Sequence, residues 1–163
     1  MKKLTILALA VTMSMSAFAM KVGYVSSQEV FSKYSGTKVV KEQLVKEKGR
    51  LENQIKKQEV DLQKLQVELQ AKGKSVTKQE KAKFQKQAEE FQKYVNQAQM
   101  NLNRQEKAKF SEITKNIEAS IQSVAKKEKF DYIFEDGAIK FGGEDITQKV
   151  LNQMEKGQKI KLK

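Results

Sequence analysis

Apolar residues that recur in alternating steps of three and four run through most of this chain and constrain its fold more than any other feature. The stretch from Lys38 to about Lys126 carries two such stripes. This spacing places the side chains along one side of a helix and is typical of a coiled coil. Each stripe is mostly apolar, with a few polar residues at stripe positions. The first consists of Leu44, Lys48, Leu51, Ile55, Gln58, Leu62, Leu65, Leu69, Lys72 and Val76, and the second of Phe84, Ala88, Phe91, Val95, Ala98, Leu102, Glu106, Phe110, Ile113, Ile117 and Val124.

A turn is predicted between the two stripes, with its tip near residues 73–77. Gly73 suits the left-handed conformation that follows a helix end, and Thr77 with Glu80 forms the capping-box pattern that starts a new helix. The sequence therefore predicts a long antiparallel helical hairpin over residues 38–126. A limb of roughly 35 residues would be about 50 Å long, so this arm should project from the rest of the molecule. The two successive steps of four from Leu102 to Phe110 form a stutter, which locally unwinds a coiled coil.

The first 19 residues have the pattern of a secretory signal peptide. Met1-Lys2-Lys3 is basic, Leu4 to Met15 is apolar, and Ala17-Phe18-Ala19 is a cleavage signal. The apolar run is shorter than the roughly 20 residues that a membrane-spanning helix needs. We therefore expect cleavage after Ala19 and export, with the formal charge falling from +12 to about +10.

The composition argues against an enzyme. The chain contains no Cys, His, Pro or Trp, so the commonest general base, the commonest metal ligands and the thiol nucleophile are missing. We therefore expect no catalytic residue, metal or cofactor. The narrow apolar stripes leave little material for a core within one chain, which favours an oligomer.

Short strands are predicted at both ends of the chain. Lys21 to Val25 favours an extended conformation, and Ser26-Ser27-Gln28-Glu29 resembles a capping box for a short helix. Phe130 to Phe134 and Ala138 to Phe141 flank Asp136-Gly137, a dipeptide typical of a tight turn, which predicts a β-hairpin. Asp145 to Gln148 should cap a last helix that carries Ile146, Val150, Leu151 and Met154 on one face.

The predicted fold is α+β and mostly α. Residues 20–37 and 127–163 form a small body, because the strands come from both ends of the chain and the arm lies between them. Three strands from one chain would leave open edges, so we expect the sheet to be shared between the subunits of a trimer. The residues assigned to this assembly are Val22, Tyr24, Val25, Tyr132, Ile133, Phe134, Ile139 and Phe141. Residues 157–163 alternate Lys with Ile and Leu, and fit either a frayed tail or an added edge strand.

These end segments give the chain its resemblance to a known family. The opening Lys21-Val22-Gly23-Tyr24-Val25 and Glu29-Val30-Phe31, the basic hairpin, and the closing Ser123-Val124-Ala125, Asp131 to Asp136 and Asp145 to Leu151 resemble the Skp (OmpH-like) family of periplasmic chaperones. The resemblance covers essentially the whole chain after the signal peptide. It implies a homotrimer whose three arms enclose a cavity and hold unfolded outer-membrane proteins, without enzymatic activity.

Positive charge is concentrated near the predicted tip of the arm. Residues 38–126 carry twenty Lys or Arg and twelve Asp or Glu, a formal charge of +8, and residues 72–86 alone carry +5. Such a field would steer an acidic client or anionic lipid toward the arm. A nucleic-acid partner is not expected, because the chain is exported and has no aromatic readout motif. The tip lysines are Lys72, Lys74, Lys78, Lys81, Lys83 and Lys86.

Four apolar residues lie off the two stripes and are candidates for contact with a client. They are Val60, Val67, Tyr94 and Met100, whereas Phe84 and Phe91 lie in the stripe and are expected to fill the arm's own core. No phosphate-binding glycine loop is present, which fits a protein that holds and releases its client without ATP.

Three functions remain open from the sequence. The first is an ATP-independent holdase for unfolded envelope proteins, the second a coiled-coil adaptor of the envelope, and the third a protein that binds lipopolysaccharide or another anionic lipid. Some relatives are proposed to bind lipopolysaccharide through a basic cluster on the return limb. Here the corresponding stretch, Leu102-Asn103-Arg104-Gln105, has one basic residue.

Overall fold

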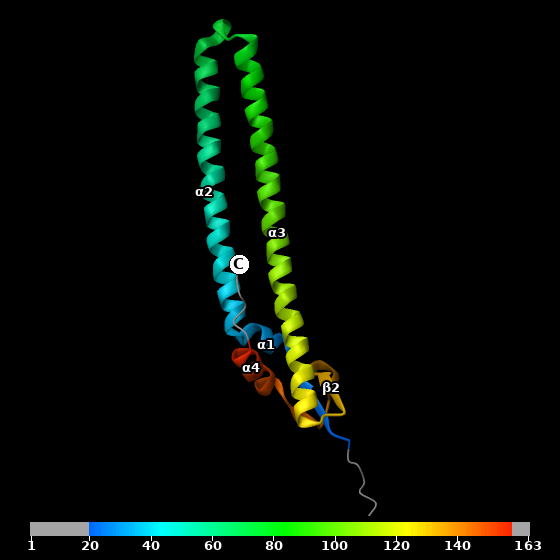
Figure 1. Cartoon of the computed structure of the whole chain (residues 1–163). Coiled ribbons are helices and arrows are strands. Elements are labelled where there is room, and N and C mark those ends of the chain that lie inside the picture. Colours follow the sequence, from blue (N-terminus) through cyan, green and yellow to red (C-terminus); the bar gives the residue numbers. More distant parts are fainter. Residues whose placement is uncertain (1–19, 158–163) are drawn as a thin grey trace, which may run out of the picture.

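The computed structural model describes residues 20–157 and shows two long helices above a small mixed base (Figure 1). The two helices form the arm, and the strands and short helices form the body. Along the chain the elements are β1 (Val22–Val25), α1 (Ser27–Lys33), α2 (Ser35–Lys72), the 3-10 turn η1 (Gly73–Ser75), α3 (Lys78–Glu128), β2 (Tyr132–Glu135), the 3-10 turn η2 (Asp136–Ala138), β3 (Glu144–Asp145) and α4 (Thr147–Lys156).

The arm consists of α2 and α3, which extend far beyond the body and lie side by side (Figure 1). Helix α2 has 38 residues and α3 has 51, so they are about 57 Å and about 76 Å long. Helix α2 begins at Ser35, directly after Tyr34, whose extended backbone separates it from α1. The predicted long helices are confirmed, with the first starting a few residues earlier than expected.

The two helices of the arm run in opposite directions. The Tyr94 hydroxyl donates a hydrogen bond to Gln54 Oε1, and near the tip Lys72 Nζ donates one to Glu80 Oε1. As α2 advances from Gln54 to Lys72, the partner on α3 moves back from Tyr94 to Glu80, so the two helices are antiparallel. The apolar members of both predicted stripes are half-buried or buried, whereas the polar members Lys48, Gln58, Lys72 and Glu106 remain exposed.

The sheet has three parallel strands in the order β2-β1-β3. In the register, Val22 pairs with Tyr132 and Val25 with Glu135, while Gly23 pairs with Glu144 on the other side. A Cβ at Gly23 would lie 3.0 Å from the Phe130 ring and 3.2 Å from the Glu144 carbonyl oxygen, so glycine allows this close approach. The two ends of the chain thus meet in one sheet, as the sequence predicted.

The predicted β-hairpin around Asp136-Gly137 is wrong. Residues 136–138 form a 3-10 turn, and residues 138–141, including Ile139 and Phe141, form no strand. The chain instead crosses from β2 to the opposite edge of β1, where Glu144–Asp145 adds the third strand. Parallel pairing of both β2 and β3 with β1 requires this crossover, which a two-residue hairpin turn cannot make.

The core joins the body to the lower part of the arm. Val25 and Val30 pack with Val40 of α2, with Ile113 of α3 and with Ile146 just before α4. Farther along the arm, where α2 and α3 face each other, most stripe residues are half-buried. The core residues from the arm therefore come from the two helix ends that adjoin the body.

The predicted capping box at Ser26 is also absent. The Ser26 side chain makes no capping hydrogen bond, and Glu29 forms an ion pair with Lys33 at 2.7 Å. The backbone N–H and the hydroxyl of Ser27 instead donate to the carboxylate of Glu135, at the end of β2. Because β2 pairs with β1, this carboxylate reaches the start of α1 and replaces the local cap.

The last helix forms as predicted, but its N-cap is Ile146, which makes no side-chain capping hydrogen bond. The Asp145 carboxylate accepts a hydrogen bond of 2.9 Å from the Thr147 backbone N–H. The hydroxyl of Thr147, together with this backbone N–H, lowers the pKa of Asp145. Val150 and Met154 are buried against the core and Leu151 is half-buried. The predicted signal peptide and most of the predicted tail lie outside the described residues.

Candidate functional site: the helical arm

The tip of the arm is closed by a group of polar contacts. Thr77 and Glu80 form the predicted capping box, in which each side chain accepts a hydrogen bond from the other's backbone N–H. Gly73 has a φ of 51°, which glycine adopts without the penalty that other residues meet. Lys72 Nζ lies 2.5 Å from Glu80 Oε1 and so connects the end of α2 to the start of α3.

Glu80 is the acid that these contacts stabilise in its charged form. The Lys72 ammonium and the backbone N–H and hydroxyl of Thr77 lower the pKa of Glu80 to about 2. Glu80 in turn raises the pKa of Lys72. Both groups are therefore charged across the physiological range.

All six tip lysines are exposed, but they are not equivalent. Lys72 is engaged by Glu80, and Lys86 lies 3.9 Å from Glu90 in a weaker surface pair. The remaining four are Lys74, Lys78, Lys81 and Lys83. The charge predicted for the tip is therefore presented to solvent.

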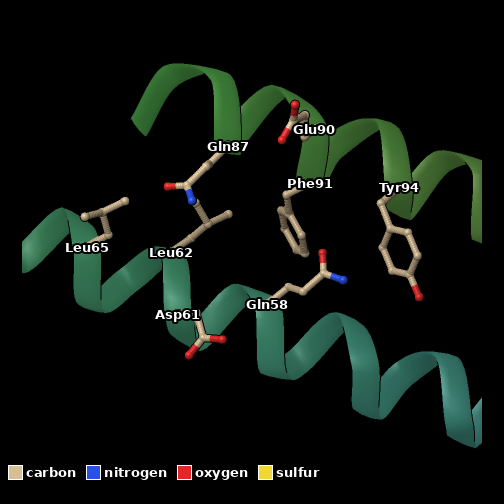
Figure 2. A pocket seen from close by; sticks show the side chains of 8 residues that line it. All are labelled: Gln58, Asp61, Leu62, Leu65, Gln87, Glu90, Phe91 and Tyr94. Atoms are coloured by element: carbon tan, nitrogen blue, oxygen red, sulfur yellow. The ribbon is translucent and has the colours of Figure 1, made fainter. Parts of the chain in front are cut away.

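Within residues 20–157, three grooves described here lie between α2 and α3 along the arm. The one nearest the tip, here called the outer groove, has a volume of about 430 Å³. Phe91 and Tyr94 on α3 point toward α2, and Leu62 and Gln58 face them from the other helix (Figure 2). The polar stripe member Gln58 thus coincides with an opening between the helices.

Four of the ten residues that line the middle groove carry uncharged amide side chains. Its volume is about 480 Å³, and Arg50, which lies in it, is held by Glu47 at 2.6 Å. This contact lowers the pKa of Glu47 and raises that of Arg50. The amides are those of Gln54, Gln97, Asn101 and Gln105.

The third groove, here called the root groove, is the one nearest the body and is mostly apolar. It has a volume of about 480 Å³. It lies at the stutter predicted in α3, which contains Glu106, and opposite the polar stripe residue Lys48 of α2. These two charged residues occupy positions where a coiled coil normally has apolar ones. Its lining residues are Lys41, Leu44, Val45, Lys48, Leu102, Glu106 and Phe110.

The four predicted client-facing residues differ in burial and do not line a common groove among those described. Tyr94 is half-buried and lines both the outer and the middle groove, where its hydroxyl contacts Gln54. Val60 is half-buried, whereas the side chains of Val67 and Met100 are 62% and 58% exposed. Sequence reasoning missed Val45, which is 70% exposed and lines the root groove. Its position one residue after Leu44 in the stripe was the available signal.

The body presents exposed aromatic side chains. Tyr132 and Phe134 on β2 stack with their ring centroids 6.2 Å apart, and Phe141 is almost fully exposed. Other predicted assembly residues lie inward, since Val25 is buried and Ile133 packs against the core. The remaining three, Val22, Tyr24 and Ile139, are half-buried.

Two other features, a metal-binding cluster and a helix able to cross a membrane, are absent from residues 20–157. This part of the chain contains no group of three or more acidic side chains arranged to hold a metal ion. None of its helices combines the length and the apolar character needed to cross a membrane.

This chain is a mixed α and β protein, in which a small body with a parallel three-stranded sheet carries one long pair of helices (Figure 1). Within that class, the chain belongs to the family of OmpH-like outer membrane proteins, whose model matches residues 21–154. No curated protein matches the sequence.

Eight chains of solved structures match. One is a candidate outer membrane chaperone (OmpH-like) from Caulobacter crescentus CB15, which aligns with a TM-score of 0.73 and 19% sequence identity over 83% of each chain. At this level of identity the likeness concerns the fold.

Proposed function

We propose that this protein is an ATP-independent chaperone of the periplasm that holds unfolded outer-membrane β-barrel proteins and prevents their aggregation. The observation that carries the proposal is the arm, whose grooves and exposed apolar side chains are distributed along its length. Membership of the OmpH-like family supports the same function.

Holding without ATP requires many weak contacts rather than one deep pocket. Each groove of the arm is open and combines apolar residues such as Leu62 or Leu102 with amide or charged groups. Burying each exposed apolar side chain would contribute at most about 1.5–3 kcal/mol, so several contacts together retain a client while any one of them breaks easily.

We further propose that the protein assembles as a homotrimer through its body. Within residues 20–157, β2 and β3 each pair only with β1, so each has a free edge, and open edges invite pairing with another chain. The stacked Tyr132 and Phe134 and the exposed Phe141 supply apolar surface that assembly would cover.

Sedimentation equilibrium of the mature protein tests the assembly. A trimer at micromolar concentration is expected, and a stable monomer would contradict it. The Phe141→Ser variant should dissociate more readily, while Val67→Ser, a matched change of an exposed apolar residue on the arm, should not. Ile133→Asp should break the assembly, because burial of an unpaired carboxylate is strongly unfavourable.

Aggregation of a β-barrel protein tests the proposed function. Urea-unfolded barrel protein is diluted into buffer with or without the mature protein, and turbidity is followed. Suppression near a stoichiometric ratio without ATP is expected for a holdase. An envelope adaptor would leave turbidity unchanged, and a lipopolysaccharide or anionic-lipid binder would act only when that lipid is present.

A further inference from the structure

The root groove is apolar surface left open next to the best-packed part of the molecule. Leu44 and Phe110 at its floor also pack against the core cluster. Beside them Val45 remains 70% exposed, although the root of the arm is where neighbouring elements are available to cover it. An additional segment of chain near this point would bury it.

The chain leaves the described part of the structure close to this groove. Near the end of α4, the Glu155 carboxylate accepts hydrogen bonds from the backbone N–H of Ser35 at 2.8 Å and from its hydroxyl at 2.6 Å, at the start of α2. Val45 lies ten residues farther along α2, which is about 15 Å. Residues 158–163, outside the described part, reach about 20 Å when extended. They are therefore long enough to reach the groove.

The chemistry of this tail matches the groove. Ile160 and Leu162 alternate with Lys159, Lys161 and Lys163, so an extended tail has one apolar side and one basic side. The apolar side fits Leu44, Val45, Leu102 and Phe110, and the basic side would face solvent or Glu106. Lys48 lies 3.8 Å from Glu52, which offsets part of the groove's own positive charge.

We propose that residues 158–163 bind in the root groove of their own chain and cover its apolar floor. If the proposed holding function is correct, the tail also competes with the client for this groove. The partner is thus a segment of the same chain, and the binding itself does not depend on any client.

Cysteine crosslinking tests the binding, because the chain has no cysteine of its own. Lys163→Cys is combined in turn with Val45→Cys, Val67→Cys or Tyr132→Cys, and disulfide formation is followed on non-reducing gels. Val67 is an exposed valine of the same helix that lies about 48 Å from Ser35, beyond the reach of the tail. A crosslink within one chain at Val45, forming about tenfold faster than at Val67, is expected because the tail is held locally at high effective concentration.

The other outcomes each overturn the proposal. A preferred crosslink at Tyr132 would place the tail at a sheet edge. A crosslink between two chains would make the occupant a second copy, and equal rates at all three positions would show an unbound tail. Changing Ile160 and Leu162 to Ser should abolish the Val45 crosslink, whereas changing Lys159 and Lys161 to Gln should preserve it. If the lysine changes abolished the crosslink and the Ile160 and Leu162 changes preserved it, the proposed apolar contact with the groove would be wrong.

A separate binding measurement tests whether the tail competes with a client for the root groove. A chain that ends at Gly157 is compared with the full chain for binding to a fluorescently labelled unfolded β-barrel protein. If the tail fills the groove in about nine molecules of ten, its removal should tighten the apparent Kd for that groove about tenfold. If the tail of the full chain crosslinks to Val45 but its removal leaves the Kd unchanged, the tail docks without competing with the client. If neither protein binds the client, the proposed function is refuted but the docking is not.

Discussion

At the scale of single residues, acids from the second half of the chain cap helices that begin near its start. Glu135 accepts from Ser27 at the start of α1, and Glu155 accepts from Ser35 at the start of α2. A helix N-terminus leaves unpaired backbone N–H groups and carries partial positive charge, which a carboxylate satisfies. These contacts connect the two ends of the chain and position the root of the arm.

Removal of the second of these caps should weaken the fold. Glu155→Ala is expected to lower the free energy of unfolding by about 1 kcal/mol, the usual cost of a lost cap, in urea titrations at one protein concentration. It should also lower the pKa of Tyr34, which burial and the negative charge of Glu155 raise. Glu59→Ala is the control, because Glu59 makes only an exposed pair with Lys56. Equal effects of the two changes would refute the capping role.

Glu80 makes the tip sensitive to acid. Lys72 and Thr77 lower its pKa from 4.5 to about 2 in the folded state, so its contribution to stability is complete above about pH 4.5 and is lost as the pH falls toward 2. NMR titration of the Glu80 side chain should give the low pKa, and Lys72→Gln should raise it toward the unperturbed value. Lys74→Gln removes an exposed tip charge that is not paired with Glu80 and should change this pKa little. Equal shifts in both variants would contradict the direct contact.

At the scale of elements, the helices were predictable and the sheet was only partly so. The spacing of three and four residues fixes which side of α2 and α3 is buried, and Gly73 and Thr77 mark the turn by local chemistry. The strands β1 and β2 were found from their composition. Strand β3 was not, because Glu144–Asp145 has no strand-like composition and is extended only by pairing with β1. The caps from Glu135 and Glu155 were equally invisible, since each joins residues more than 100 positions apart.

The outer and root grooves were predictable in position but not recognised from the sequence. The stripes contain the polar residues Lys48, Gln58, Lys72 and Glu106. In the structure Lys48, Gln58 and Glu106 each line a groove, whereas Lys72 pairs with Glu80 at the tip. A polar side chain in the stripe does not fill the space between two helices as an apolar one does. The outer and root grooves therefore follow from the same residues that interrupt the pattern.

Filling the root groove should stabilise the arm. Lys48→Leu combined with Glu106→Leu places two apolar side chains between the helices, and partial burial of both should raise the free energy of unfolding by about 1–2 kcal/mol in urea titrations. Lys46→Leu with Lys107→Leu removes charges at exposed positions outside the stripes and should change it by less than about 0.5 kcal/mol. The interpretation would be wrong if both pairs had the same effect.

At the scale of the whole molecule, charge and apolar surface are arranged differently along the arm. The tip lysines are exposed at the end far from the body, whereas the grooves extend from near the tip to the root. Surface charges farther apart than about 8 Å are largely screened in physiological salt, so one lysine contributes little while the group produces a summed field. We therefore propose that the tip lysines capture a client and that the grooves retain it.

This division predicts a kinetic effect of the tip lysines as a set. Changing all six to Gln should slow association with an acidic unfolded β-barrel protein and flatten its dependence on salt in stopped-flow measurements, while the dissociation rate and the helical circular dichroism change little. A five-fold variant that retains Lys72, and with it the contact to Glu80, should behave similarly, whereas Lys74→Gln alone should be nearly silent.

A control variant that loses the same charge elsewhere on the arm tests whether the position of the lysines matters. Five lysines of the return limb, Lys93, Lys107, Lys109, Lys115 and Lys126, are changed to Gln for comparison with the five-fold tip variant. Both proteins lose the same net charge, so a purely global effect would slow association equally and refute steering by the tip. Steering by the tip requires the larger loss in the tip variant at low salt, with the difference shrinking as salt rises. If the six-fold tip variant associates as fast as the parent at low salt, the grooves alone account for capture as well as retention.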